Sequence, residues 1–138
     1  MRVVLDANVW ISAAISSGPS RRIVHTWLAE QPFEVILCPR LLDEVRHVLT
    51  ERPRLRAWIS QADAELFVAT LTTLTDLAPD PPPGAALTRD PNDDYLIDLA
   101  RTHHADVIVS GDADLLEWDD QHPPVISPSA FEARLTRH

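Results

Sequence analysis

Acidic residues follow short apolar segments at two places in this chain of 138 residues. Asp6 ends the run VVLD near the N-terminus, and Asp112 follows VIVSG much later. Two further acidic stretches, LLDEV around Glu44 and RDPNDD around Asp93, lie between them. Carboxylate oxygens are the ligands that hard divalent cations prefer, and carboxylates also serve in proton transfer. The chemistry of these stretches therefore depends on whether the fold brings them together.

Short apolar segments alternate with helical ones along most of the chain. Strands are expected over 2–6, 33–38, 106–110 and 123–127, with a further short strand over 74–78. Helices are expected over about 8–15, 20–30, 39–51, 53–75 (as two helices), 91–104, 112–118 and 128–136. The alternation predicts an α/β fold, with a central, mainly parallel sheet between two helical layers. The length predicts one domain over 1–138, with the proline-rich segment 79–84 as a surface loop.

In a parallel sheet, ligands bind at the edge formed by the carboxyl ends of the strands. Asp6 and Asp112 each follow a strand at this edge, and Glu44 and Asp93 lie in helices connected to it. We therefore expect four carboxylates from four separate segments to gather at one end of the sheet. Four such charges would repel one another unless a cation neutralised them, which favours Mg²⁺, with Mn²⁺ as an alternative.

Helical geometry indicates which acids point inward. At about 100° per residue, Glu44 borders the apolar face of the helix over 39–51, whereas Asp43 points nearly opposite. Asp93 lies on the packed face of the helix over 91–104, and Asp94 faces away. An irregular first turn leaves open whether Asp93 or Asp94 is the third acid.

Each acid also has a purely structural interpretation. Asp6, Asp90 and Asp112 all stand where helix N-caps are found, and Pro91 follows Asp90 at the favoured first position. Glu44 alone would be read as a solvated side chain. The metal-binding hypothesis therefore depends on the four acids together.

Four stretches, VVLDANVWISA, CPRLLDEVRHVL, RDPNDDYLIDLA and DVIVSGDADLL, resemble the ordered motifs of PIN-domain proteins. The resemblance covers roughly residues 2–130 and is closest to VapC-type toxins of toxin–antitoxin pairs. It implies that the catalytic and metal-binding acids are Asp6, Glu44, Asp93 and Asp112, with Asp94 as the alternative third ligand. It also implies supporting roles for Asn8, Ser12, Ser110 and Asp114.

The resemblance implies a metal-dependent endoribonuclease that hydrolyses RNA phosphodiester bonds with Mg²⁺. Its expected partners are an RNA substrate, a small antitoxin protein and a second copy of the chain in a homodimer. The alternatives are a non-catalytic PIN scaffold that binds RNA or protein, and a structure-specific DNA nuclease. Whether one or two metal ions bind is open.

The basic residues bear on substrate binding. The net charge is −9, and all twelve basic residues are arginine. An acidic chain needs a local basic patch to hold a nucleic acid, which we expect from Arg52, Arg54, Arg56 and Arg89. The absence of lysine argues against receiver domains and haloacid-dehalogenase-type phosphatases, because both need a lysine near the phosphoryl group.

Three further features narrow the setting. A single cysteine, Cys38, excludes a zinc site built on several thiolates. No apolar run reaches the length of a membrane span, and Asp6 and Asn8 interrupt the only apolar N-terminal segment, so we expect a cytoplasmic protein without a signal peptide. Trp27 and Trp58 stand at helical spacing among apolar residues, which favours a place in the core or at a partner interface over base stacking.

Overall fold

The computed structural model describes residues 1–82, 84, 91–119 and 121–136. Its four strands form one sheet in the order β2-β1-β3-β4, in which every neighbouring pair is parallel. The strands are β1 (Arg2–Leu5), β2 (Glu34–Val35), β3 (Val107–Val109) and β4 (Val125–Ile126). The apolar residues of β1 and β3 are completely buried, as expected for central parallel strands covered on both faces.

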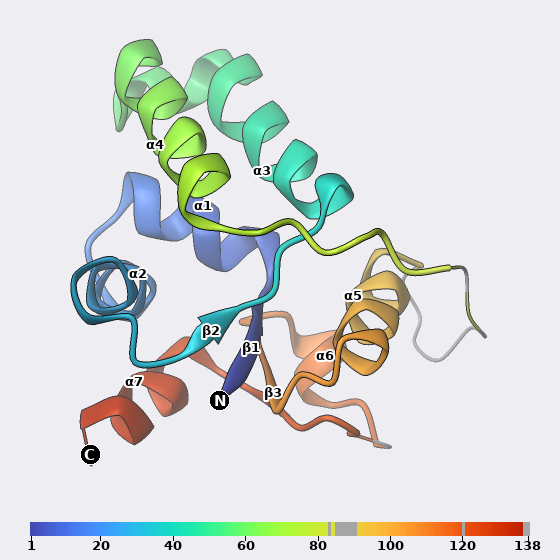
Figure 1. Ribbon diagram of the computed structural model, residues 1–138. Helices are drawn as coiled ribbons and strands as arrows, with labels where there is room; N and C mark the ends of the chain where they lie inside the picture. The colour runs from blue at the N-terminus through green and yellow to red at the C-terminus, as the bar shows by residue number, and fades with distance from the viewer. Residues whose placement is uncertain (83, 85–90, 120, 137–138) are drawn as a thin grey trace.

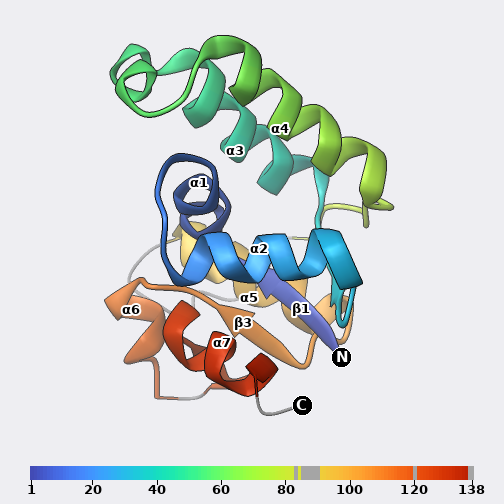
Figure 2. The same cartoon turned by 90° about the vertical axis from the view of Figure 1, so that its left-hand side faces the viewer.

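Helices cover both faces of this sheet, which confirms the predicted α/β architecture. They are α1 (Ala7–Ile15), α2 (Pro19–Glu30), α3 (Pro39–Glu51), α4 (Gln61–Leu74), α5 (Pro91–Thr102), α6 (Ala113–Leu116) and α7 (Pro128–Thr136), with a 3₁₀ helix, η1 (Pro53–Ala57), before α4. Figures 1 and 2 show α2 and α7 on one side of the strands and α5 on the other. No helix in the described ranges combines the length and apolar character that crossing a bilayer requires.

The pair formed by α3 and α4 lies beyond the end of the sheet at which β1 leads into α1 (Figure 1). These two helices pack against each other, and α3 also packs on α1. The carboxyl ends of the strands therefore face a helical cover, and η1 connects the two helices of that cover. This arrangement leaves room for a site between the sheet edge and α3.

Aromatic residues form much of the core next to the sheet. Trp10 and Trp27 pack edge to face with ring centroids 5.6 Å apart, and Phe33 packs on Phe131 in the same way at 5.2 Å. Trp27 is therefore a core residue, as expected. Trp58 is not, because 60% of its surface is exposed.

The segment 33–38 pairs over a shorter length than its sequence predicts. The N–H of Ile36 donates to the carbonyl of Val3 at 2.9 Å, and the chain then leaves the ladder. The carbonyl of Leu37 instead accepts the N–H of Ala78 at 2.8 Å. The prediction of a strand over 74–78 is wrong, because α4 continues to Leu74 and the residues after it form no ladder. The bond from Ala78 to Leu37 is the one backbone hydrogen bond that the described residues show between this segment and the end of the segment 33–38.

Candidate metal centre

A cavity of about 360 Å³ lies between the carboxyl end of the sheet and α3. All four acids predicted from the sequence line it: Asp6, Glu44, Asp93 and Asp112. They come from the end of β1, from α3, from the first turn of α5 and from the turn after β3. We call this space the acid cavity. The fold thus brings together the carboxylates that the sequence only suggested as neighbours.

Asp6 is held in place by both strand and helix geometry. Its backbone N–H donates to the carbonyl of Val109 at 3.0 Å, which continues the pairing of β1 with β3. Its side chain caps α1, because Oδ1 accepts the N–H of Asn8 at 3.2 Å. The capping role and the place in the acid cavity are therefore compatible, and the sequence could not show this.

Ser110 joins two of the acids through one hydroxyl. The side chain is fully buried, and its backbone N–H donates to the carbonyl of Ile126 at 3.0 Å. Its O–H donates to Oδ2 of Asp6 at 2.7 Å, while its oxygen accepts the N–H of Asp112 at 3.0 Å. The predicted supporting residue thus sets the relative position of Asp6 and Asp112.

Burial raises the pKa of Asp6 above its ordinary value of 3.8. The hydrogen bonds from Ser110 and Asn8 act in the opposite direction, and the nearby charge of Asp112 raises the pKa further. The charged form of Asp6 is therefore costly in the absence of a cation. A bound cation would favour this charged form, as is usual for carboxylates that serve as metal ligands.

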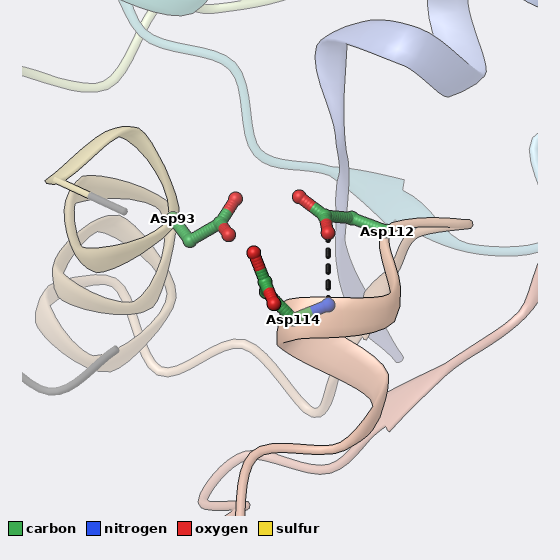
Figure 3. A group of neighbouring side chains, drawn as sticks. All are labelled: Asp93, Asp112 and Asp114. Atoms are coloured by element: carbon green, nitrogen blue, oxygen red, sulfur yellow. Dashed lines mark hydrogen bonds between the residues drawn. The ribbon is translucent and has the colours of Figure 1, made fainter. Parts of the chain in front are cut away.

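Three carboxylates lie close enough to share one ion. Among the described residues these are Asp93, Asp112 and Asp114, with one oxygen of each within 4.8 Å of the others (Figure 3). Hard divalent ions bind oxygens at about 2.0 to 2.6 Å, so ligands on opposite sides of an ion are about 4 to 5 Å apart. The spacing and the oxygen-only donors of this acidic triad therefore fit Mg²⁺ or Mn²⁺.

Figure 3 shows how the acidic triad is assembled. Asp93 points from α5 toward Asp112 and Asp114, which come from the turn and first residues of α6. Asp112 caps α6, since its Oδ1 accepts the N–H of Asp114 at 2.9 Å. The sequence assigned Asp114 only a supporting role, but this short capping turn places its carboxylate beside the other two.

The structure distinguishes the two acids in each adjacent pair, Asp93 with Asp94 and Glu44 with Asp43. Asp93 is 4% exposed and lines the acid cavity, whereas Asp94 is half-buried and lies outside that lining. Glu44 is exposed but faces the cavity, while Asp43 pairs with Arg46 at 3.6 Å on the surface. These positions agree with helix phase; the metal-binding role of each acid stays a prediction.

The remaining predicted residues fall in different places. Asn8 lines the acid cavity, whereas Ser12 is not among the described residues around it and its Oγ lies 3.1 Å from Oγ of Ser16. Arg52 and Arg54 line the cavity, and their role in substrate binding stays a prediction.

Arg56 is directed elsewhere than its two neighbours. Its guanidinium donates to the carbonyl of Leu49 and to Oε1 of Gln61, and the side chain lines a second cavity. The predicted basic cluster is therefore divided in two. Arg89, the fourth predicted arginine, lies outside the described residues.

Comparison with known proteins identifies the family. Neither the curated proteins nor the solved structures include a significant match to this chain. The sequence profile of the PIN domain, by contrast, matches residues 2–114. The matched part includes β1, β2 and β3, the acid cavity and the whole acidic triad. The chain belongs to the PIN-domain family, a family of nucleases whose members are typically metal-dependent hydrolases.

Proposed function

We propose that this protein is a metal-dependent endoribonuclease that uses Mg²⁺, or Mn²⁺ in its place, to hydrolyse RNA phosphodiester bonds. One observation carries the proposal: four acids from four segments line a single cavity, together with Arg52 and Arg54. Carboxylates alone would repel a phosphate, but carboxylates that hold a cation attract one. The family membership supports hydrolysis as the reaction.

The residues of the chain divide the work among them. Asp93, Asp112 and Asp114 would hold the ion, and Asp6 would contribute from beside Asp112, with its orientation set by Ser110. A divalent ion at this place would lower the pKa of a bound water and neutralise charge on the attacked phosphate.

Proton transfer and substrate binding involve side chains of the cavity that lie outside the acidic triad. Glu44 is exposed within the cavity, so it is placed to take a proton from the attacking water. Arg52 and Arg54 are exposed, and their positive charges attract the phosphates on either side of the scissile bond. Asn8 lies at the same cavity and is placed to orient a water or a phosphate oxygen.

We further propose that the protein is the toxin of a toxin–antitoxin pair in the cytoplasm, neutralised by a small antitoxin and assembled as a homodimer. The support is the similarity of its four acidic motifs to those of VapC-type toxins. Co-expression of the chain with a short protein encoded beside it tests this part: growth arrest by the chain alone should be relieved by that protein. Arrest that Asp93→Asn does not relieve would contradict the toxin assignment.

The nuclease assignment is tested by incubating the purified protein with single-stranded RNA and with duplex and flapped DNA, in Mg²⁺ or in EDTA. RNA cleavage in Mg²⁺ alone, lost in Asp6→Asn and in Glu44→Gln, is the expected result. Asp43→Asn is the matched control, because Asp43 adjoins Glu44 in sequence but pairs with Arg46 on the surface.

Three other outcomes would contradict the proposal in different ways. Cleavage that persists in EDTA would exclude the metal mechanism. Cleavage of flapped DNA in preference to RNA would identify a DNA nuclease instead. Binding of RNA without any cleavage would identify a scaffold.

A further inference from the structure

A second cavity, of about 540 Å³, lies beside the helical cover of the acid cavity. Residues of α1, α2 and α4 form its walls, and η1 with the residues after it contributes Arg56, Trp58 and Ile59. The walls combine apolar and polar side chains in similar measure. We call this space the outer groove. It is larger than the acid cavity and holds a different set of side chains.

The charges in the outer groove are mainly basic. Arg21 and Arg56 line it against a single carboxylate, Asp63. The chain as a whole carries a net charge of −9, so this surface differs in sign from the average. A local excess of basic side chains favours an anionic ligand, whose binding the rest of the molecule would oppose.

Trp58 presents a large aromatic surface at this groove. Its exposed fraction is 60%, which is high for tryptophan. Its backbone is nevertheless fixed, because its N–H donates to the carbonyl of Leu55 at 2.9 Å at the end of η1. An exposed ring on an ordered backbone is suited to stacking against a flat ligand at little entropic cost.

The helix η1 forms the boundary between the two cavities. Arg54 and Leu55 line the acid cavity, while Arg56 lines the outer groove. Successive residues of a 3₁₀ helix are separated by about 120°, so Arg54 and Arg56 leave it in different directions. A single-stranded nucleic acid bound in the acid cavity therefore needs to cross only this one turn to reach Trp58.

We propose that single-stranded RNA leaves the acid cavity across η1 and stacks a base on Trp58 in the outer groove. The proposal rests on the nuclease function proposed above. Arg52 and Arg54 hold phosphates near the scissile bond, and Arg21 meets a phosphate beyond η1. Arg56 adds positive charge there while its guanidinium stays bonded to Leu49 and Gln61. Basic side chains combined with an aromatic platform are the usual features of sequence-tolerant single-strand binding. Trp58 thereby acts as a positioning residue that selects longer RNA.

The test compares RNA of two lengths with the full chain. Binding of fluorescein-labelled oligouridine is measured by anisotropy in an Asp6→Asn background, which prevents cleavage, with a dodecamer and with a dinucleotide. Trp58→Ala should weaken binding of the dodecamer by about fivefold to a hundredfold, since stacking of one base contributes about 1 to 3 kcal/mol. The dinucleotide, which reaches only the acid cavity, should bind equally well with and without Trp58.

Two further variants exclude a general structural effect. Trp58→Phe should recover most of the affinity for the dodecamer, because it keeps an aromatic face. Leu74→Ala removes another exposed apolar side chain, at the far end of α4 and outside both cavities, and should leave both affinities unchanged. In the chain that retains Asp6, Trp58→Ala should raise KM for the dodecamer with kcat nearly unchanged.

Equal loss for both RNA lengths would overturn the proposal, because Trp58 would then act through the acid cavity. Unchanged binding of both, with a change in the mass of the protein by light scattering, would overturn it in favour of a protein interface. The proposal would also be overturned if neither the unsubstituted chain nor any of its variants bound RNA. Trp58-dependent binding by a chain that cleaves nothing would keep the RNA path and reject only the nuclease function.

Discussion

The acid cavity and the outer groove lie on opposite sides of η1 but are built in different ways. Two carboxylates of the acid cavity, Asp6 and Asp112, follow the ends of strands and are fixed by hydrogen bonds with the buried Ser110. The outer groove is formed by side chains of α1, α2, α4 and the end of η1, and its aromatic residue is exposed.

This difference separates chemistry from recognition. A reaction needs groups held to within a fraction of an ångström, which strand ends and buried networks provide. Binding of a flexible polymer needs surface area, charge and tolerance of sequence, which exposed side chains on helices provide. Four changes would test this division, and the first three compare one region with a matched position outside it.

The largest effect is expected at the acidic triad. Asp93 is the most buried carboxylate of the acidic triad, and Asp93→Asn replaces it with a neutral amide. RNA cleavage should therefore fall at least about 100-fold. Asp94→Asn, one residue away and outside the cavity lining, should change the rate by less than about threefold. The measurement is the initial rate in Mg²⁺, with affinity for Mn²⁺ as a second readout. Equal losses in both variants would remove the distinction between the two acids.

The boundary between the regions is tested by Leu55→Ala. Leu55 is the buried residue of η1, and its side chain forms part of the acid cavity. Truncating a buried leucine costs about 2 to 5 kcal/mol, so the midpoint of urea unfolding should fall clearly. Leu66→Ala, at a position 65% exposed on α4, should change the free energy of unfolding by less than about 0.5 kcal/mol. A stable Leu55→Ala variant would show that η1 is not held by this contact.

A smaller effect is expected for the phosphate-binding arginines. Arg54→Ala should weaken RNA binding by a few-fold at low salt and lower the slope of log K against log salt by about 0.7, which corresponds to one phosphate contact on a single strand. Arg134→Ala, in the last turn of α7, is the control. An unchanged salt slope in Arg54→Ala would mean that this side chain meets no phosphate.

The smallest effect concerns the stability of the metal-free protein. Because burial raises the pKa of Asp6 in the folded state, the contribution of this group to stability is fully present below the ordinary value of 3.8 and is lost as the pH rises through the folded-state pKa. Asp6→Asn has no buried carboxyl to ionise at neutral pH, so in EDTA its Tm should exceed that of the unsubstituted chain by a few degrees. The difference should shrink as the pH is lowered.

Addition of Mg²⁺ should reverse the order of the two proteins, because only the unsubstituted chain keeps its full set of carboxylates. An Asp6→Asn variant less stable than the original chain in EDTA at neutral pH would contradict this account.

Much of the fold could be predicted because its signals are local. The apolar segments and the helical spacing placed all four strands and most helix bounds within a few residues. Helix phase alone placed Asp93 inward and Asp94 outward, and Glu44 toward the cavity and Asp43 toward the surface. These are properties of one element at a time.

What could not be predicted depends on contacts between distant elements. β1 continues to Leu5, but β2 pairs with it over two residues only, and the carbonyl of Leu37 accepts the N–H of Ala78 instead. Arg56 was grouped with Arg52 and Arg54 because sequence spacing does not reveal that the turn is 3₁₀. Asp114 reaches the acidic triad only through the capping turn made by Asp112.

The hydrogen bond between Ser110 and Asp6 joins residues 104 positions apart, and β1 pairs with β3 across the same separation. A ribosome therefore makes Ser110 104 residues after Asp6. The four carboxylates of the acid cavity therefore stay apart along the nascent polypeptide until Asp112 has been made. A nascent chain that has not reached the turn after β3 lacks the complete set of acids, so it cannot yet carry out the chemistry that we propose for the acid cavity.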